Sequence, residues 1–150
     1  MEHLDLPVKE LIKAAMEAKK KAYTPYSGYQ VGAALLTNEL RIYTGCNIEN
    51  ASYTPTICAE RTAIFKAVSE GWKRFLAIAI VGGAKGKPME EYAYPCGVCR
   101  QVMREFTDPD KFIVIVARSE EDYRIFHLSD LLPQSFGPEY LHRETNESGD

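Results

Sequence analysis

The chain has 150 residues, 45% of them hydrophobic and 26% charged, a composition typical of one compact domain with a core of its own. Its formal net charge of -3 at pH 7 excludes the cationic surface that binding to long nucleic acid requires. No stretch approaches the roughly 20 apolar residues of a membrane span. We therefore expect a soluble, cytoplasmic single domain over residues 1–150, with about 143–150 as a frayed tail.

The first part of the chain is predicted to form a helix followed by a β-hairpin. In residues 8–23 apolar positions recur at helical spacing with charged residues between them, which indicates an amphipathic helix that ends before Pro25. Residues 30–37 and 41–46 are rich in β-formers and are separated by Asn38-Glu39, which predicts a hairpin. The first of these strands is almost entirely apolar, so we expect it to be buried on both faces.

The rest of the chain alternates strands and helices. In chain order we expect a helix at 59–70, a strand at 75–81, a glycine-rich loop at 82–88, a helix at 97–106, strands at 112–117 and 123–127, and a helical turn at 129–132 capped by Ser129. This alternation predicts an α/β fold of three layers, α/β/α, in which helices cover both faces of a mixed five-stranded sheet.

Three of the four cysteines lie in two short motifs that together are typical of a metal site. The motifs are Cys58-Ala59-Glu60 and Pro95-Cys96-Gly97-Val98-Cys99, with a predicted strand between them. Zinc binds cysteine as thiolate, and a catalytic zinc site uses three protein ligands and leaves one position for water. All three cysteines are predicted at helix N-termini, where unpaired N–H groups and the helix dipole lower the pKa of a thiol. We therefore expect Cys58, Cys96 and Cys99 to bind Zn²⁺.

The charge of such a site calls for compensation. Three thiolates around Zn²⁺ leave a net negative centre, which makes coordinated water less acidic than three neutral histidines would. A nearby cation is therefore expected, and Arg61 and Arg100 directly follow the two motifs.

Glu60 is predicted to carry protons and not to bind the metal. Hydrolysis of an amidine-like carbon requires that hydroxide be made from water and that the departing ammonia be protonated, and one carboxylate can do both in turn. A Cys or His before x-Glu, followed later by Pro-Cys-x-x-Cys, is the signature of zinc nucleobase deaminases. All of these residues are present here in that order.

Parts of the pattern are compatible with other sites. A Cys-x-x-Cys pair such as Cys96 and Cys99 also occurs in structural zinc knuckles and in thioredoxin-like redox sites. A structural zinc would need a fourth protein ligand. Cys46 is predicted to be a small buried residue of a strand, and none of the three histidines, His3, His127 and His142, has the spacing of a ligand.

With these residues identified, the chain closely resembles the small homotetrameric cytidine deaminases, from its first predicted helix to about His142. The motifs that carry the resemblance are Pro25-Tyr26-Ser27, Val31-Gly32-Ala33-Ala34, Gly45-Cys46-Asn47-Ile48-Glu49-Asn50-Ala51, Cys58-Ala59-Glu60-Arg61-Thr62-Ala63, Pro95-Cys96-Gly97-Val98-Cys99-Arg100-Gln101 and Leu131-Leu132-Pro133. The resemblance implies the cytidine deaminase fold and hydrolytic deamination of cytidine and deoxycytidine to uridine and deoxyuridine in pyrimidine salvage. It also implies attack of zinc-bound hydroxide at C4, with Glu60 as the proton shuttle.

The resemblance also implies how the nucleoside is bound. Asn47 and Glu49 would hydrogen-bond the sugar hydroxyls, and the backbone at Ala59 would meet the pyrimidine carbonyl. Arg61 would offset the charge of the thiolates. Because an unpaired buried amide or carboxylate is costly, this arrangement would reject a base that lacks its sugar. The Asn47 to Asn50 segment is also compatible with ordinary turn chemistry.

Three aromatic residues complete the implied pocket. Tyr29 stands where the family usually has a phenylalanine against the nucleoside, and its hydroxyl needs a partner. Phe136 matches an aromatic residue that stacks on the base from a neighbouring subunit, and Tyr53 matches one that also crosses an interface. The resemblance thus implies a homotetramer with shared active sites, although both residues are also compatible with simple core or interface packing.

Other functions share some of these features. A deaminase of bases within RNA or DNA would use the same zinc chemistry but would need a basic surface. The sequence is also compatible with a deaminase of a nucleoside analogue. A non-catalytic, zinc-stabilised binding module would keep the thiols but would have no use for Glu60, so replacing Glu60 by Gln separates it from an enzyme.

Overall fold

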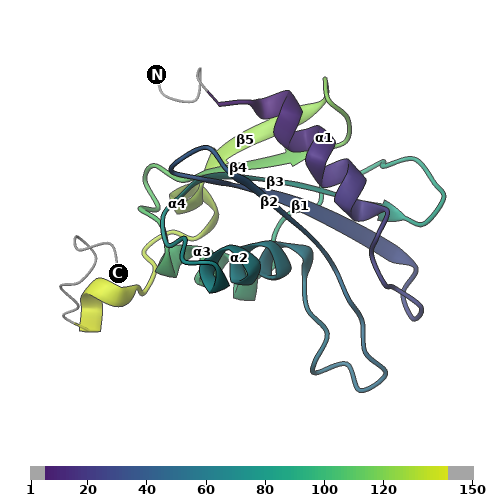
Figure 1. Ribbon diagram of the computed structural model, residues 1–150, viewed down its shortest axis with the longest axis horizontal. Helices are drawn as coiled ribbons and strands as arrows, with labels where there is room; N and C mark the ends of the chain where they lie inside the picture. Colours follow the sequence, from purple (N-terminus) through teal and green to yellow (C-terminus); the bar gives the residue numbers. More distant parts are fainter. Residues whose placement is uncertain (1–5, 142–150) are drawn as a thin grey trace.

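The computed structural model describes residues 6–141, which form a three-layered α/β fold around one five-stranded sheet (Figure 1). The strands are β1 (Tyr29–Thr37), β2 (Ile42–Cys46), β3 (Phe75–Ala84), β4 (Ile113–Ala117) and β5 (Tyr123–His127). Their order in the sheet is β2-β1-β3-β4-β5. Only the β3–β4 pair is parallel among these strands, so the sheet is mixed, as predicted.

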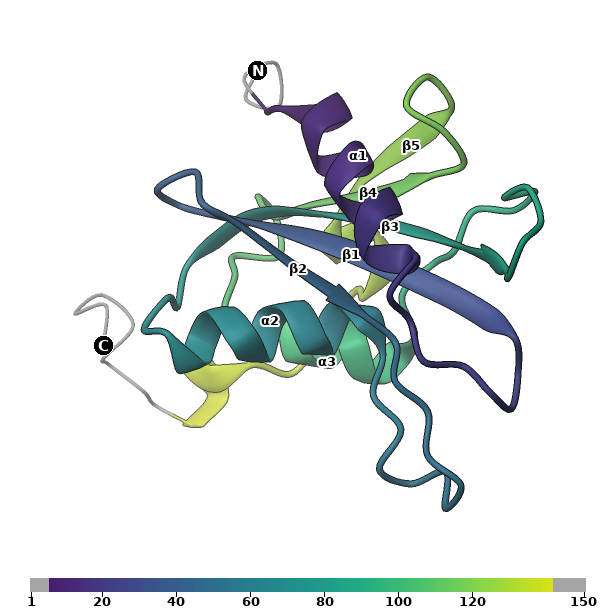
Figure 2. The ribbon, with the colours of Figure 1, turned by 45° about the vertical axis from the view of Figure 1, so that its right-hand side comes forward.

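Helices cover both faces of the sheet. The helices are α1 (Val8–Lys19), α2 (Ala59–Ser69), α3 (Gly97–Glu105), α4 (Leu128–Leu131) and the 3₁₀ helix η2 (Pro138–Leu141). Helix α1 lies on one face, and α2 and α3 lie side by side on the other (Figure 2). The predicted α/β/α layering is therefore confirmed. No helix within residues 6–141 is both long and apolar enough to cross a membrane.

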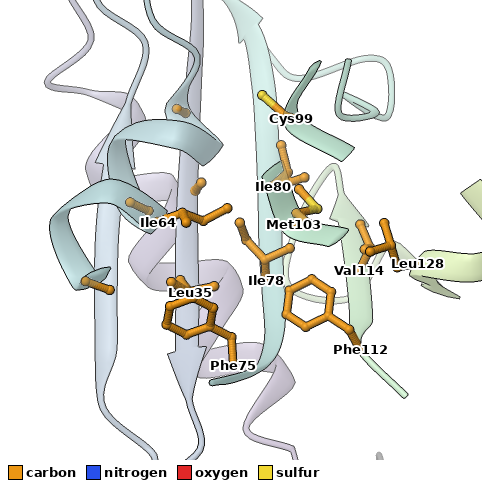
Figure 3. Close-up of a cluster of buried hydrophobic side chains, with 14 of the residues drawn as sticks. Leu35, Ile64, Phe75, Ile78, Ile80, Cys99, Met103, Phe112, Val114 and Leu128 are labelled. Atoms are coloured by element: carbon orange, nitrogen blue, oxygen red, sulfur yellow. The ribbon is translucent and has the colours of Figure 1, made fainter. Parts of the chain in front are cut away.

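Strand β1 supplies side chains to both cores, as its apolar run predicts. Successive strand residues point to opposite faces. Ala33 and Leu35 pack in the cluster with α2 and α3 (Figure 3), and Ala34 and Leu36 pack in the cluster with α1. Cys99 belongs to the first cluster, so a candidate zinc ligand is part of the hydrophobic core.

Two strand glycines allow helices to approach the sheet closely. A Cβ atom at Gly32 would lie 2.0 Å from the carbonyl oxygen of Ala15 in α1. A Cβ atom at Gly45 would lie 2.5 Å from the carbonyl oxygen of Ala59, in the first turn of α2. These are backbone contacts that cannot relax cheaply. Gly45 therefore determines how closely the start of α2 lies against β2.

Two predicted boundaries near the first hairpin are wrong. Helix α1 ends at Lys19 and not near Tyr23, because the Tyr23 N–H donates to the carbonyl of Asn47 (3.0 Å) instead of continuing the helix. The hairpin turn also extends beyond Asn38-Glu39, since Leu40 adopts a positive φ of 66° and the Thr37 N–H donates to the carbonyl of Arg41 (2.9 Å).

Two later predictions also need correction. Gly82 and Gly83 continue β3, where they pair with Val31 and Gln30, and are not part of a loop. The N-cap of α4 is His127 and not Ser129, because the His127 N–H donates to Asp130 (3.0 Å) in a capping box. His3, His142 and the predicted tail lie outside the described residues.

Candidate active site

The three motif cysteines meet where α2 and α3 begin, on the same face of the sheet. Cys58 is the N-cap of α2 and Cys96 the N-cap of α3, and Cys99 lies in the first turn of α3. Their sulfur atoms lie within 4.8 Å of one another, and the Cys58 and Cys96 sulfurs are 3.9 Å apart. Two segments about 40 residues apart in sequence are thus brought together, with the helix N-termini placed as predicted.

This spacing fits a zinc ion held by three cysteines. Sulfur ligands arranged tetrahedrally about 2.3 Å from Zn²⁺ lie about 3.8 Å from each other, close to the observed separation of Cys58 and Cys96. Cys58 is half-buried, Cys96 is exposed and Cys99 is buried, so the centre lies at the edge of the core with one open side. Cys46 is not in this cluster, so residues 6–141 supply three protein ligands, the number found in catalytic zinc sites.

Hydrogen bonds and charge favour the ionised form of one thiol. A hydrogen bond with Cys99 and a further bond from Arg61 outweigh burial and lower the pKa of Cys58 to about 5. The Arg61 Nη2 atom lies 3.2 Å from the Cys58 sulfur. The same bond with Cys58, together with burial, raises the pKa of Cys99. In the metal-free protein, these interactions therefore favour a thiolate at Cys58 and a protonated thiol at Cys99.

Of the two arginines proposed to offset the thiolates, only one contacts a sulfur atom. Arg61 donates to Cys58, and its Nε is buried without a hydrogen-bond partner among residues 6–141. Arg100 instead donates to the carbonyl oxygens of Pro95 (2.7 Å) and Leu131 (2.6 Å). Arg100 therefore fastens the chain around Cys96 and does not serve as a counter-charge.

Glu60 lies in the first turn of α2, beside the thiols, and is only 4% exposed. Burial, aided by the nearby Cys58 charge, raises the pKa of its carboxyl to about 7, although its own backbone N–H and Arg61 act in the opposite direction. A carboxyl group with this pKa can both accept and donate a proton near neutral pH. The arrangement can therefore support hydrolysis in which one group moves protons in two directions.

Asn47 and Glu49 lie directly after β2 and hold neighbouring backbone segments. Asn47 accepts from the Val31 N–H and donates to the Tyr29 carbonyl, both at 2.9 Å. Glu49 accepts from the N–H groups of Tyr26 (2.9 Å) and Ser27 (3.1 Å) and from the Ser27 hydroxyl.

The bonds to Ser27, reinforced by the Tyr26 N–H, lower the pKa of the Glu49 carboxyl. Ser27 also accepts from the Tyr29 N–H (3.0 Å), so this serine links Glu49 to the start of β1. Sequence reasoning gave Ser27 no role. The Pro25-Tyr26-Ser27 motif is the signal that could have drawn attention to it.

The Tyr29 side chain lies over β3 and beside the segment that leads to Cys96. A Cβ atom at Gly82 would lie 3.0 Å from the Tyr29 hydroxyl and 2.9 Å from the Ala93 Cβ, so both groups occupy the space above this glycine. Burial, followed by the nearby charge of Glu91, raises the pKa of the Tyr29 phenol. Gly82 and Ala93 are neighbours of Tyr29 that the sequence patterns do not indicate.

Tyr53 and Phe136 are not brought into this cluster within one chain. Tyr53 is 71% exposed on the loop between β2 and α2, where its ring meets Tyr26 edge-on at 6.5 Å. Phe136 is 56% exposed and stacks on Tyr140 at 5.3 Å. The η2 segment that follows Phe136 lies at the opposite end of α2 from that loop (Figure 1; Figure 2).

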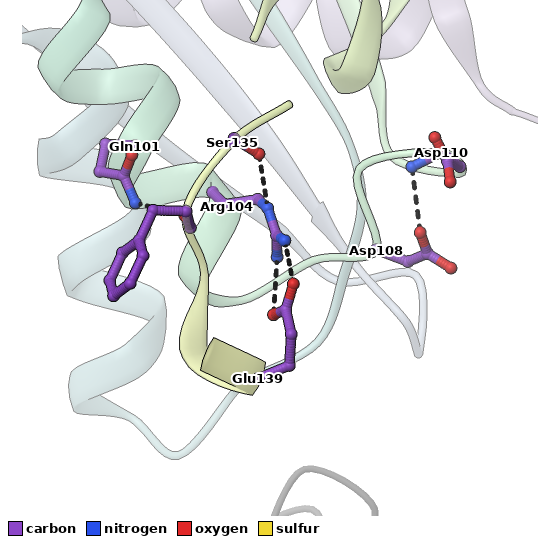
Figure 4. Close-up of polar contacts among 7 residues, drawn as sticks. Gln101, Arg104, Asp108, Asp110, Ser135 and Glu139 are labelled. Carbon is purple, nitrogen blue, oxygen red and sulfur yellow. Dashed lines mark hydrogen bonds and ion pairs between the residues drawn. The ribbon is translucent and has the colours of Figure 1, made fainter. Parts of the chain in front are cut away.

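The segment with Phe136 is fastened to α3. Gln101 donates to the Phe136 carbonyl (2.9 Å), and Arg104 binds both Ser135 (2.7 Å) and Glu139 (Figure 4). The Phe136 side chain thus remains exposed while its backbone is fixed.

Comparisons with a protein family, with named relatives and with a solved structure all point to the same family. Residues 7–116 match the family described as "Cytidine and deoxycytidylate deaminase zinc-binding region". The chain is 44% identical to a cytidine deaminase of Sporosarcina psychrophila, with 91% of this chain and 96% of the relative covered, and 47% identical to one of Halalkalibacterium halodurans, with 86% and 93% covered. A crystal structure of cytidine deaminase from Burkholderia pseudomallei superimposes with a TM-score of 0.75 at 46% identity, covering 85% of this chain and 97% of the other.

Proposed function

The chain belongs to the family of zinc-dependent cytidine deaminases, and on that premise we propose that it hydrolyses cytidine and deoxycytidine to uridine and deoxyuridine, with release of ammonia, in pyrimidine salvage. The observation that carries the proposal is the placement of Glu60. This buried carboxyl, with a pKa raised to about 7, lies in the first turn of α2, two residues after Cys58, one of three convergent thiols. Such a group is suited to moving protons during hydrolysis.

Cys58, Cys96 and Cys99 are the residues that would hold the zinc ion. When bound, Zn²⁺ supplies the Lewis acidity that makes a nucleophile from water near neutral pH. Arg61 offsets part of the negative charge of the three sulfurs through its bond to Cys58. The half-exposed edge of the cluster leaves room for substrate on one side.

Glu60 moves the protons of the reaction. It takes one proton from the attacking water and gives it to N3 of the pyrimidine as the C4–O bond forms. It then takes the remaining proton of the new C4 hydroxyl and gives it to the amino group, which leaves as ammonia when the C4–N bond breaks. These transfers add one water molecule and release one ammonia, so the balance of protons closes. The neighbouring backbone N–H of Ala59, in the first turn of α2, is free of helical bonding and is suited to the pyrimidine carbonyl.

Asn47 and Glu49 are suited to bind the sugar because each keeps a hydrogen-bonding valence. A carboxylate accepts about four hydrogen bonds, and Glu49 uses three on Tyr26 and Ser27. The Asn47 amide has two N–H donors, and one is bonded to the Tyr29 carbonyl. Their other bonds fix both groups in position, so that a ribose hydroxyl meets preoriented partners.

The aromatic walls come from more than one subunit in this proposal. Tyr29 faces the nucleoside within one chain, and the exposed Tyr53 and Phe136 reach the pockets of neighbouring copies in a homotetramer. Their exposure supports this assignment, since within one chain their rings contact only Tyr26 and Tyr140 among the aromatic residues that the structure describes. We place the enzyme in the cytoplasm, where the reducing environment keeps its four free cysteines available.

The test is absorbance and ammonia release with cytidine, deoxycytidine, free cytosine and adenosine, on protein of measured zinc content. We expect turnover of the two cytosine nucleosides and little of the other two compounds. Glu60→Gln should retain zinc and lower kcat by about 10²- to 10⁴-fold, the usual contribution of general acid–base catalysis. Glu10→Gln, an exposed change on α1, is the matched control. Wild-type turnover by Glu60→Gln would contradict the proposal, as would zinc-loaded protein inactive on every compound.

The sugar contacts have a separate test. Glu49→Gln keeps the shape of the side chain but loses its charge. We expect it to raise the KM for cytidine by about ten-fold, the cost of weakening one hydrogen bond to a charged group, with a smaller change in kcat. Equal effects on cytidine and free cytosine would show that Glu49 does not read the sugar.

A further inference from the structure

The segment that delivers Cys96 to the metal centre is a long connection, residues 85–96, between β3 and α3. It has no helix or strand of its own. A connection of this length is free to move unless other parts of the fold fasten it. Side chains from the hairpin formed by β4 and β5 provide that fastening.

Tyr92 is the centre of the contact. Its hydroxyl donates to Asp122 in the turn between β4 and β5. The guanidinium carbons of Arg118 and Arg124 lie over its ring, 4.7 Å and 4.4 Å from the ring centroid. A tyrosine ring beneath two arginines has favourable cation–π interactions with both, and we call the group of Tyr92, Arg118, Asp122 and Arg124 the hairpin clamp.

The clamp is held together by its own charges. Arg118 binds Asp122 through Nε (2.8 Å) and Nη2 (2.6 Å), so the carboxylate offsets part of the positive charge around the ring. Arg118 also donates from Nη1 to the carbonyl of Glu90 (3.0 Å), in the connection itself. One arginine therefore bonds the hairpin turn and the backbone of the connection at the same time.

The three residues between Tyr92 and Cys96 are also fastened one after another. Ala93 lies above Gly82 together with the Tyr29 hydroxyl. Tyr94 packs against Phe126 of β5, with ring centroids 5.8 Å apart. Pro95 is buried, and its carbonyl accepts from Arg100 (2.7 Å).

We propose that Tyr92 is a positioning residue for the metal centre, because the hairpin clamp fixes the connection that places Cys96 beside Cys58 and Cys99. Without the clamp, binding of the metal would have to order this connection, and the lost conformational freedom would weaken zinc binding. The inference rests on the zinc centre of the proposed function. Loss of the clamp should also shift Ala93. The Tyr29 side chain, which shares the space above Gly82 with Ala93, should then shift as well.

The test measures the rate of zinc loss from the purified full chain to a chromogenic chelator in excess. We expect Tyr92→Leu, which removes the hydroxyl and both cation–π contacts, to lose zinc about ten-fold faster than wild type. Tyr92→Phe keeps the ring and should fall between the two. Tyr123→Leu, the same substitution on the same hairpin but outside the clamp, should remain within about two-fold of wild type.

Further measurements separate positioning from simple destabilisation. With zinc in excess, Tyr92→Phe should raise the KM for cytidine more than it lowers kcat, because Ala93 and Tyr29 line the substrate side. Asp122→Asn combined with Tyr92→Phe should accelerate zinc loss by less than the product of the two single effects, as expected for members of one unit. If Tyr92→Leu does not fold, Tyr92→Phe and its combination with Asp122→Asn are used to test the positioning role.

The outcomes distinguish the inference from the function on which it rests. Zinc loss at the wild-type rate from the Tyr92 variants, with wild type holding one zinc per chain, overturns the positioning role alone, even if the melting temperature falls. Wild-type protein that takes up no zinc overturns the metal centre itself. Equal acceleration in Tyr123→Leu and Tyr92→Leu also overturns the positioning role of Tyr92, because the effect would then belong to the hairpin as a whole.

Discussion

The Arg61 Nη2 atom lies 3.2 Å from the sulfur of Cys58, the N-cap residue of α2, which precedes Arg61 by three positions. Residues three apart share one face of a helix, so the guanidinium is aimed back at the thiol by the helix itself. This contact supplies positive charge where three sulfurs converge. It also belongs to the group of interactions that lowers the pKa of Cys58 to about 5.

Replacing Arg61 by Gln should therefore make Cys58 less acidic. In the metal-free protein the pKa of the Cys58 thiol should rise, because the bond and charge from Arg61 are lost while burial remains. The rate of Cys58 alkylation by iodoacetamide, followed against pH by mass spectrometry, measures this shift. The midpoint of the wild-type profile should lie near pH 5, and that of Arg61→Gln at higher pH.

The control for this prediction is Arg41→Gln, which removes a guanidinium that lies over Trp72, away from the thiols. Its alkylation profile should match that of wild type. Identical midpoints for Arg61→Gln and wild type would mean that Cys99 and the helix N-terminus set the acidity of Cys58 without the arginine.

Arg61 and Arg100 differ in a way that the sequence patterns could not predict. Both arginines directly follow a motif, and charge arguments favour either one. Arg61 lies three residues after Cys58 and faces it, whereas Arg100 directly follows Cys99, and consecutive helical residues point in different directions. The three sulfurs and Glu60 could be placed from the sequence because each lies at a predicted helix start, where local rules hold.

Contacts between distant segments could not be predicted in the same way. Tyr92 and Asp122 are 30 residues apart, and no periodicity or motif relates them. Gly82 and Gly83 suggest a loop by local rules, but pairing with β1 keeps them in β3. The early end of α1 also has a tertiary cause, because the Tyr23 N–H bonds to the chain after β2. In each case a long-range hydrogen bond outweighs a local preference.

The ion pair between Arg104 and Glu139 predicts a dependence of stability on pH. The bond from Arg104 lowers the pKa of the Glu139 carboxyl below its ordinary value of 4.5. A carboxyl group whose pKa is lower in the folded state contributes stability above its unfolded pKa and loses that contribution as the pH falls through the folded value. Glu139→Gln should therefore destabilise the protein at pH 6, and the destabilisation should shrink progressively as the pH is lowered from 4.5 to well below 4.

Chemical denaturation of metal-free wild type and Glu139→Gln over this pH range measures this difference. Metal-free protein is used because acid also releases zinc from thiolates. Asp110→Asn, whose side chain lies in an exposed turn nearby (Figure 4), is a suitable control. A difference between wild type and Glu139→Gln that stays constant from pH 6 to below pH 4 would contradict the assigned role of the ion pair.

Substitutions of Gly137 and Arg104 are predicted to have non-additive effects on the free energy of unfolding. A Cβ atom at Gly137 would lie 2.3 Å from Nη1 of Arg104, whose side chain is held by Ser135 and Glu139. Gly137→Ala should therefore cost about 1–3 kcal/mol of stability, the usual range for overpacking. In an Arg104→Ala background the same change should cost little, because the obstructing guanidinium is gone. A double-mutant cycle from urea unfolding measures the coupling, and additive effects would show that Gly137 is needed for another reason.

Tyr29 allows the ring and the hydroxyl to be tested separately. The ring lies above Gly82, and the hydroxyl shares that space with Ala93. Tyr29→Phe keeps the apolar face, so the KM for cytidine should change by less than about three-fold, as expected for a side chain that is partly exposed. Tyr29→Leu removes the flat ring face and should raise the KM by about ten-fold or more, since aromatic contacts contribute about 0.5–1.5 kcal/mol beyond their buried area.

Steady-state kinetics on zinc-loaded protein, with Tyr123→Leu as the control, gives both KM values. If Tyr29→Phe instead loses as much as Tyr29→Leu, the hydroxyl and not the ring is the group that contacts substrate, and its position beside Ala93 becomes a determinant of specificity.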